Sequence, residues 1–360
     1  MENFSSIIGQ ENAKKLLFLA LKNDKIAHGY LFIGPPNLGK FKTATEFAKA
    51  LQCQDKINCF ACGKCRHCSL TESRTNPDVL FVEPTKGKGA DGSPAEEKTI
   101  SIDQIREIEH HLSLFPYDSK YKIAIVNQAH KFSEQAANAF LKTLEEPRGN
   151  SVMILIAEND RFLPKTLVSR VQKIRFNLVA DKIIENSMVE RGASASDARE
   201  IAFLAANRPG LAIELRRNIG AMADYKETIK NFHRFFKGDL PEKFSFAEML
   251  GKDNRRAADV LKAWLIYSHK MLLDSANIGK PPHQGLTPVA WGNTLSDFTP
   301  FIPVLTDKNL WRGGKESETK KLARFLSAGG KILKLINTSN VNARLAMETL
   351  ALEILAPYQK

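Results

Sequence analysis

Five cysteines, the chain's full set, fall between Cys53 and Cys68 and are the clearest candidates for chemistry. Disulfides usually staple distant segments, whereas a tight cluster of thiols is typical of a metal site. Two sets of four are possible: an even C-x2-C-x2-C-x2-C ladder that begins at Cys59, and a C-x8-C-x2-C-x2-C pattern that begins at Cys53. Both sets continue with Cys62, Cys65 and Cys68.

Four thiolates predict one structural zinc ion, Zn²⁺, in a closed tetrahedral site. Such a site leaves no ligand position open to a substrate, so the spacing argues against a catalytic metal. A bacterial ferredoxin cluster is disfavoured because its cysteine run ends in x3-C-P, and Cys68 is followed by Ser69. The basic neighbours Lys64, Arg66 and His67 would offset the negative charge of four thiolates around zinc.

A second candidate site is the segment GPPNLGK at residues 34–40. It follows a short apolar run and precedes a helical pattern that begins near Phe41. A GxxxxGK sequence between a strand and a helix predicts a phosphate-binding loop. Backbone N–H groups between Gly34 and Gly39 would cradle the phosphates, and the ammonium group of Lys40 would contact them.

Side chains that ATP hydrolysis requires are missing around this loop. The residue after Lys40 should be Ser or Thr, whose hydroxyl holds Mg²⁺, but it is Phe41. The apolar run at 123–126 should end in carboxylates that bind Mg²⁺ and orient water, but Asn127 and Gln128 follow it. We therefore predict that ATP is not hydrolysed. Nucleotide binding without hydrolysis stays compatible with the retained glycines and lysine.

Hydrophobic periodicity indicates the elements that would position these residues. Short apolar runs alternate with helical patterns in the first half of the chain, which predicts an α/β fold with a parallel sheet covered on both faces. The stretch 85–98 is rich in Gly, Pro and charged residues and predicts an exposed loop. The apolar runs lie at residues 30–33, 79–82, 123–126, 152–156 and 174–176.

Beyond about residue 178 the strand signal fades and the pattern becomes helical. We predict an α/β domain at 1–178, which contains the cysteine module at 53–68. A small helical lid domain should follow at 179–221, and a helical C-terminal domain at 222–360. The turn Arg208-Pro209-Gly210 would separate two helices of the lid.

The chain is basic and carries no sequence signal for export or membrane insertion. Its 52 Lys and Arg against 40 Asp and Glu give a formal net charge of +12. This excess suits a polyanionic partner such as DNA, because counterions released from phosphates favour binding. The N-terminal segment lacks the apolar region of a signal peptide, and no run of about 18 apolar residues occurs. We expect a cytoplasmic protein without membrane contact.

Several motifs resemble the delta-prime subunits of the bacterial DNA polymerase III clamp loader, a family of AAA+ proteins. The likeness is dense over residues 4–178 and returns in the segment 342–348. It implies a P-loop AAA+ parallel-sheet domain, a helical lid and a helical collar that assembles subunits. The motifs are Ile8-Gly9-Gln10-Glu11, Ala27-His28-Gly29-Tyr30-Leu31-Phe32, the phosphate loop, Asn76-Pro77-Asp78-Val79, residues 137–147 (ANAFLKTLEEP) and Leu167-Val168-Ser169-Arg170.

The resemblance implies a subunit of the polymerase complex without enzymatic activity of its own. Its partners would be the other clamp-loader subunits, in a hetero-oligomeric ring that uses ATP to load the sliding clamp. The clamp and primer–template DNA would be met through the assembled complex. The family motif Ser-Arg-Cys sends its arginine into the neighbouring subunit's ATP site. Ser169-Arg170-Val171 keeps that arginine, so Arg170 is expected to act as an arginine finger in trans.

The resemblance also distinguishes between the two cysteine sets. The family takes its first zinc ligand from the end of the helix that follows the phosphate loop. This implies Cys53, Cys62, Cys65 and Cys68 as ligands and leaves Cys59 outside the site.

Two other classes of function compete with this interpretation. A clamp-loader motor subunit that hydrolyses ATP would share most of the motifs, and Phe41, Asn127 and Gln128 argue against it. A zinc-dependent DNA-binding factor would explain the charge and the cysteines but not the α/β domain.

Overall fold

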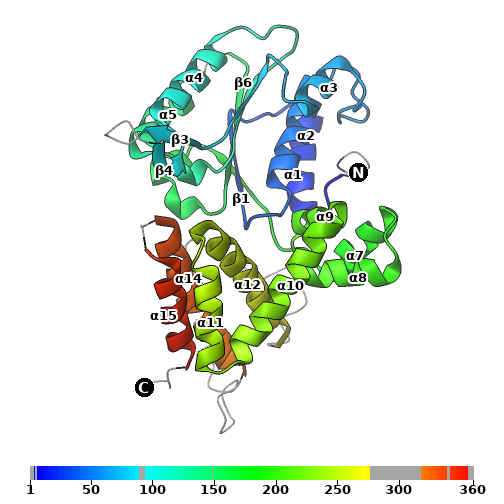
Figure 1. The fold of residues 1–360 in the computed structure, drawn as a ribbon. Coiled ribbons are helices and arrows are strands. Elements are labelled where there is room, and N and C mark those ends of the chain that lie inside the picture. Colours follow the sequence, from blue (N-terminus) through cyan, green and yellow to red (C-terminus); the bar gives the residue numbers. More distant parts are fainter. Residues whose placement is uncertain are drawn as a thin grey trace. The chain divides into compact units, whose positions relative to one another are not determined.

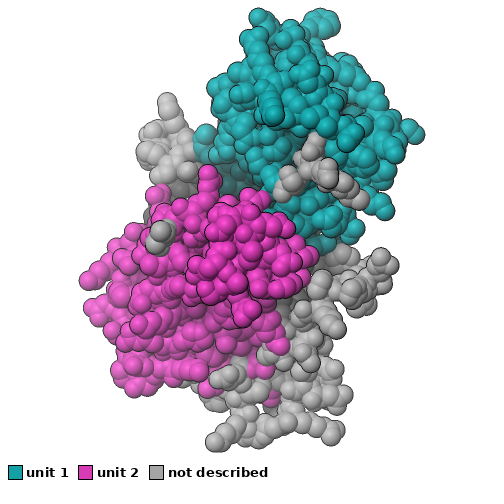
Figure 2. Space-filling model, turned by 90° about the vertical axis from the view of Figure 1, so that its right-hand side faces the viewer, with its two compact units in different colours: residues 1–179 teal, residues 180–360 magenta. Residues whose placement is uncertain are grey.

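The structure is a computed structural model that describes residues 4, 6–88, 94–147, 149–275, 318–338 and 341–355. The chain forms two compact units, residues 1–179 and residues 180–360 (Figure 2). No helix in the described ranges is long and apolar enough to cross a membrane.

Unit 1 is built around a parallel sheet of five strands, visible in Figure 1. The strands occur in the order β2-β5-β6-β1-β7, and each printed pairing between neighbours is parallel. Strand β1 lies inside the sheet and every one of its residues is buried, as its continuous apolar sequence predicts. The strands are β1 (Gly29–Ile33), β2 (Val79–Val82), β5 (Lys122–Val126), β6 (Ser151–Ala157) and β7 (Gln172–Arg175).

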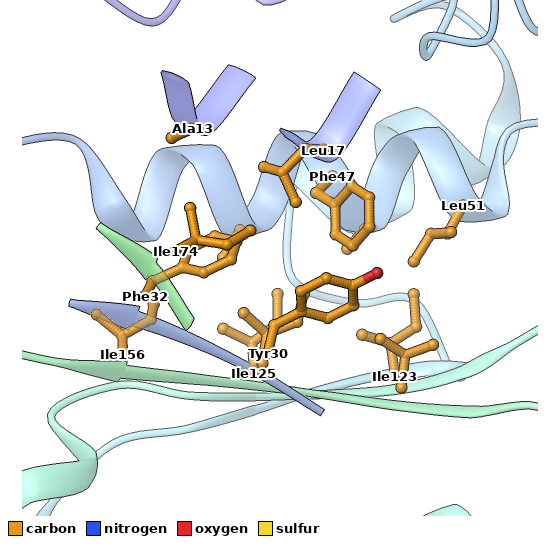
Figure 3. Close-up of a cluster of buried hydrophobic side chains, with 14 of the residues drawn as sticks. Ala13, Leu17, Tyr30, Phe32, Phe47, Leu51, Ile123, Ile125, Ile156 and Ile174 are labelled. Carbon is orange, nitrogen blue, oxygen red and sulfur yellow. The ribbon is translucent and has the colours of Figure 1, made fainter. Parts of the chain in front are cut away.

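Helices cover both faces of this sheet because successive strand residues point to opposite sides. Tyr30 and Phe32 of β1 pack in one core with α1 (Glu11–Lys22) and α2 (Lys40–Gln52), as Figure 3 shows. Leu31 and Ile33 pack in the opposite core with α4 (Ile102–Ser113) and α5 (Glu134–Glu145). The predicted fold class, a P-loop parallel sheet followed by helical regions, is confirmed.

A short hairpin, β3 (Thr85–Lys88) and β4 (Pro94–Thr99), lies outside the main sheet. The prediction of a loop over 85–98 is wrong for these residues, while residues 89–93 lie outside the described part of the chain. Backbone pairing across the hairpin overrides the weak strand propensity of its sequence. Unit 1 also contains α3 (Arg66–Glu72), α6 (Lys165–Val168) and two 3₁₀ turns, η2 (Ala129–Lys131) and η3 (Asp160–Phe162).

Unit 2 is helical in its described residues. An aromatic cluster forms part of its core, where Trp264 lies 4.9 Å from Phe235 and 6.0 Å from Phe232 between ring centroids. Lys270 pairs with Asp181 at 2.6 Å and so joins the helices of the predicted lid to those that follow. The division into a lid and a collar stays a prediction. The helices are α7 (Asp181–Glu190), α8 (Ala195–Leu204), α9 (Pro209–Arg217), α10 (Ile219–Lys237), α11 (Leu240–Leu250), α12 (Asn254–Ser275), α14 (Glu318–Thr338) and α15 (Ala343–Leu355).

Candidate metal centre and nucleotide site

The cysteine module brings four of the five thiols together. The Sγ atoms of Cys53, Cys62, Cys65 and Cys68 all lie within 4.8 Å of one another. Helix α2 ends at the first of these residues and α3 begins after the third, so two helix ends and the loop between them build the cluster. Cys59 is not part of the group. Of the two possible sets of four cysteines, the structure therefore brings together the one that begins at Cys53, at the end of α2.

The geometry of the cluster fits a tetrahedral zinc ion. Zinc–sulfur bonds of about 2.3 Å place tetrahedral sulfur atoms about 3.8 Å apart, and the Sγ atoms of Cys53 and Cys65 are 3.8 Å apart. The backbone N–H groups of Lys64 and Cys65 donate to Cys62 Sγ and lower the pKa of that thiol to about 7. Burial raises the pKa values of the Cys53 and Cys68 thiols, a penalty that a bound cation would overcome.

Contacts with other parts of unit 1, among them α1 and α2, hold the cysteine module and α3 in place. The ring of Phe60 lies 5.1 Å from that of Phe4 and 5.4 Å from that of Phe18, between centroids. Glu72 of α3 pairs with Lys42 and Lys49 of α2 at 2.7 and 2.8 Å. These hydrogen-bonded ammonium groups lower the pKa of Glu72 to about 2. The helix that starts at the phosphate loop is thus tied directly to the module.

The phosphate loop keeps the backbone form that its sequence predicts. Gly34 has φ +152°, and a Cβ there would lie 2.3 Å from the carbonyl oxygen of Phe176, so no side chain fits. Gly39 has φ +86° and caps the start of α2. Its left-handed backbone favours glycine although the space around it is open. Gly34 is therefore required by its close approach to Phe176, and Gly39 is favoured by its left-handed backbone.

Lys40 lies at the start of α2, and its ammonium group turns toward the loop. Its Nζ atom donates to the carbonyl oxygens of Gly34 and Pro35, each at 2.5 Å. A phosphate group would have to compete with these carbonyls for the ammonium. The structure thus brings the loop glycines and Lys40 together, but the ammonium group of Lys40 already donates to carbonyl oxygens of the loop.

Phe41 occupies the position where a hydroxyl would be needed for Mg²⁺. Its ring lies 6.0 Å from the ring of Phe81 on β2, and the guanidinium carbon of Arg74 lies 4.6 Å from its centroid. Arg74 also pairs with Glu83 at 3.3 Å. The side chain of Phe41 therefore packs against both Phe81 and Arg74.

The amides Asn127 and Gln128 follow β5, as the sequence predicts. The N–H of Asn127 donates to the carbonyl of Val82, and Gln128 has a left-handed backbone. Neither residue supplies a negative charge for a metal or for a water molecule. The next turn holds His130, whose Nδ1 is buried and makes no hydrogen bond with any residue that the structure describes. Burial, then the nearby charges of Lys131 and Lys40, lower the pKa of His130 to about 4.

Arg170 lies on the surface, just beyond α6. Its guanidinium donates to the carbonyl of Thr166 at 2.9 Å and pairs with Glu145 at 2.8 Å. Arg170 precedes β7, whereas the phosphate loop follows β1, and the two strands are parallel. The four-residue strand separates the two sites by about 13 Å along its direction. Arg170 is therefore not placed to act on the phosphate loop of its own chain.

Two partners of these residues were missed by reasoning from the sequence. Glu145, which orients Arg170, belongs to a Leu-Glu-Glu-Pro segment whose role as an ion-pair partner has no local signal. Arg74 covers Phe41 although 33 positions separate them in the sequence. Contacts of this kind arise from tertiary packing, which hydrophobic periodicity does not encode.

Comparisons with known proteins agree with the resemblance in the sequence. A family described as "DNA polymerase III, delta subunit" matches residues 9–180. The chain is 32% identical to the DNA polymerase III subunit delta' of Bacillus subtilis, over 58% of this chain and 60% of that protein. It is also 32% identical to subunit tau of the same organism, over 52% of this chain and 31% of that protein. The chain thus spans about 60% of the length of the first of these relatives.

A solved structure covers nearly the whole chain. The DNA polymerase III gamma subunit-related protein of Thermotoga maritima aligns with a TM-score of 0.48 and 16% identity, over 95% of this chain and 98% of that one. The family match and the sequence relatives confirm the resemblance to DNA polymerase III clamp-loader subunits, of which both delta' and tau relatives are found.

Proposed function

We propose that this chain, whose residues 9–180 match the DNA polymerase III subunit family, is a delta-prime-like clamp-loader subunit that does not hydrolyse ATP. One observation carries the proposal: an intact phosphate loop is followed by Phe41 in a packed aromatic contact, and the amides Asn127 and Gln128 follow β5 where carboxylates would be needed. The loop could bind phosphate, but these three residues provide no Mg²⁺ ligand and no base.

A motor subunit is the alternative, because the chain is also similar to a tau subunit. Steady-state ATPase measurements on the purified chain test the choice. We expect no turnover above background, and Lys40→Ala should leave that background unchanged. Turnover by the wild type that disappears in Lys40→Ala would contradict the proposal and favour the motor.

The subunit would still control chemistry through Arg170, acting as an arginine finger in a neighbouring subunit. A guanidinium beside a transferring phosphoryl group stabilises the charge that develops there, which raises the rate by about 10³–10⁵. The pair with Glu145 supports this role, because a surface ion pair is weak and can be exchanged for phosphate.

Reconstitution of the clamp loader with variant subunits tests this assignment. Arg170→Ala should leave assembly intact, lower the total ATPase rate partially and lower clamp loading severely, because one site of the ring loses its finger. Arg170→Lys should also be defective, since an ammonium group lacks the planar fork of guanidinium. Arg161→Ala, at another exposed arginine, is the matched control. Wild-type activity in an intact ring that contains Arg170→Ala would contradict the role.

We also infer that the four clustered cysteines hold one structural zinc ion. Bound zinc would supply a cross-link between the ends of α2 and α3, and no chemistry. Within the loader, the partners would be the other ring subunits, with the sliding clamp and primer–template DNA met in the assembled complex in the cytoplasm.

A further inference from the structure

The turn between α8 and α9 in unit 2 holds a buried arginine. Arg208 is 6% exposed and is the N-cap residue of α9. Its Nη1 donates to the carbonyl of Ala206 at 2.7 Å, whereas its Nε is buried and makes no hydrogen bond with any described residue. Burial lowers the pKa of Arg208 to about 10, so the guanidinium is still charged at neutral pH. Unit 2 thus encloses a positive charge with at least one unused donor.

No carboxylate among the described residues neutralises this charge. Of the described side chains, only the hydroxyl of Tyr225 acts on the guanidinium electrostatically. The carboxylate of Asp181, at the start of α7, accepts from Asn207 at 3.0 Å and pairs with Lys270 at 2.6 Å. Buried charges in proteins are normally paired, because removing an ion from water without a counter-ion is costly. The guanidinium of Arg208 therefore favours a negatively charged partner.

The side chains around the guanidinium are neutral. The hydroxyl of Tyr225, on α10, is buried and makes no hydrogen bond with any described residue. Burial raises the pKa of Tyr225 to about 12, although the charge of Arg208 opposes that rise. Burial, then the charge of Arg208, lower the pKa of His269 on α12 to about 3. The phenol can therefore donate a hydrogen bond beside Arg208, but neither ring supplies a counter-charge.

The backbone before Arg208 has an uncommon conformation. Ala206 and Asn207 have φ angles of +48° and +65°, in the left-handed region that disfavours a side chain such as that of alanine. Such strain persists where the surroundings fix it. Here the carboxylate of Asp181 holds the side chain of Asn207, and the guanidinium of Arg208 holds the carbonyl of Ala206. The turn thus keeps Arg208 inside unit 2.

We propose that unit 2 binds a small inorganic anion of the chloride class between the Nε of Arg208 and the hydroxyl of Tyr225. Both groups would donate hydrogen bonds to the anion, whose charge would neutralise the guanidinium. The amino end of α9 favours negative charge at the same turn. A water molecule would accept the hydrogen bonds but leave the charge uncompensated, and a large anion does not fit between two enclosed groups.

Thermal unfolding of the full-length chain in increasing chloride tests the proposal. Tryptophan fluorescence follows unit 2, because all three tryptophans of the chain lie in residues 180–360. Chloride replaces gluconate at constant ionic strength, so that screening does not change. The midpoint should rise by roughly 3–5 °C for each ten-fold increase in chloride above its dissociation constant, since the ion binds the folded state.

Three variants show whether the rise comes from this site. Arg208→Met should abolish the dependence on chloride, and Tyr225→Phe should reduce it. Arg217→Met, at an exposed arginine of α9, is the matched control and should keep the wild-type rise. Tyr225→Phe decides alone if Arg208→Met does not fold. A wild-type rise in Tyr225→Phe, or in a folded Arg208→Met, would overturn the proposal.

Bromide, which resembles chloride and scatters X-rays anomalously, locates the anion directly. Crystals of the full-length chain soaked in bromide should show an anomalous peak beside the Nε of Arg208 and the hydroxyl of Tyr225. A water molecule at that place without an anomalous peak would overturn the proposal, as would peaks at the protein surface alone. Neither measurement uses ATP or another subunit, so both outcomes are independent of the proposed function.

Discussion

Helix α2 joins the phosphate loop at its start to the cysteine module at its end, yet the two sites differ in what they have kept. The module has its side-chain ligands, whereas the phosphate loop has its backbone form without the side chains that hydrolysis needs. The module brings four side chains to within 4.8 Å of one another, with backbone N–H groups directed at their sulfur atoms. The phosphate loop keeps its backbone form, but side chains of other chemistry occupy the metal and base positions. The contrast agrees with the proposed function, in which the loop and the module serve the structure of the subunit.

The largest expected effect comes from removing one ligand of the module. Cys62→Ser should lose the zinc and lower the free energy of unfolding by on the order of 4 kcal/mol, because loss of a structural metal is among the most destabilising changes. Cys59→Ser should keep the zinc, because Cys59 lies outside the cluster. Elemental analysis and thermal denaturation of both variants check this. Loss of zinc in Cys59→Ser but not in Cys53→Ser would show that the other set binds the metal.

An intermediate effect on stability is expected when acid protonates His130, which lies in η2 after β5. The folded pKa of His130 is about 4, below the ordinary 6.5. The unfolded chain therefore binds more protons between these values, so the contribution of neutral His130 is complete above pH 6.5 and is lost as the pH falls to 4. The loss is at most about 3 kcal/mol.

Urea unfolding of His130→Phe between pH 7 and pH 4 measures this contribution. The variant should show a flatter dependence of stability on pH than the wild type. His110→Phe, which removes an exposed histidine of α4, should keep the wild-type slope. Equal slopes in all three proteins would show that burial of His130, with the charges of Lys131 and Lys40, does not disfavour its protonation.

The smallest effect is expected from restoring one hydroxyl. Phe41→Thr should lower the free energy of unfolding by about 1–2 kcal/mol, because a half-buried ring is lost from its contact with Phe81. It should add no ATPase activity, since Asn127 and Gln128 still provide no carboxylate. Denaturation and a steady-state ATPase assay check both parts. ATP turnover by this variant would contradict the contrast, because it would show that the phosphate loop lacks only one hydroxyl for hydrolysis.

The sequence predicted the sheet and the local form of the sites because both depend on neighbouring residues. Continuous apolar runs predicted the five strands, and GPPNLGK predicted a loop between a strand and a helix. In the structure, Gly34 and Gly39 of that loop have positive φ. Spacing alone left two cysteine sets open, since proximity between the end of α2 and residues 62–68 depends on how the chain folds back. The apolar pattern also gave no sign that Phe115 is exposed, because an identical run could end in the core.

The packing of Phe41 has a consequence for how this chain can change over generations. A substitution that restores a hydroxyl at position 41 removes the ring from Phe81 and Arg74, and so lowers stability before any activity can appear. Gain of carboxylates at Asn127 or Gln128 alone places negative charge near a loop that has no hydroxyl to complete a metal site. Every first step is neutral or harmful, so selection has no gradual path back. Under the proposed function, descendants of this chain should therefore inherit the inactive site as a permanent character.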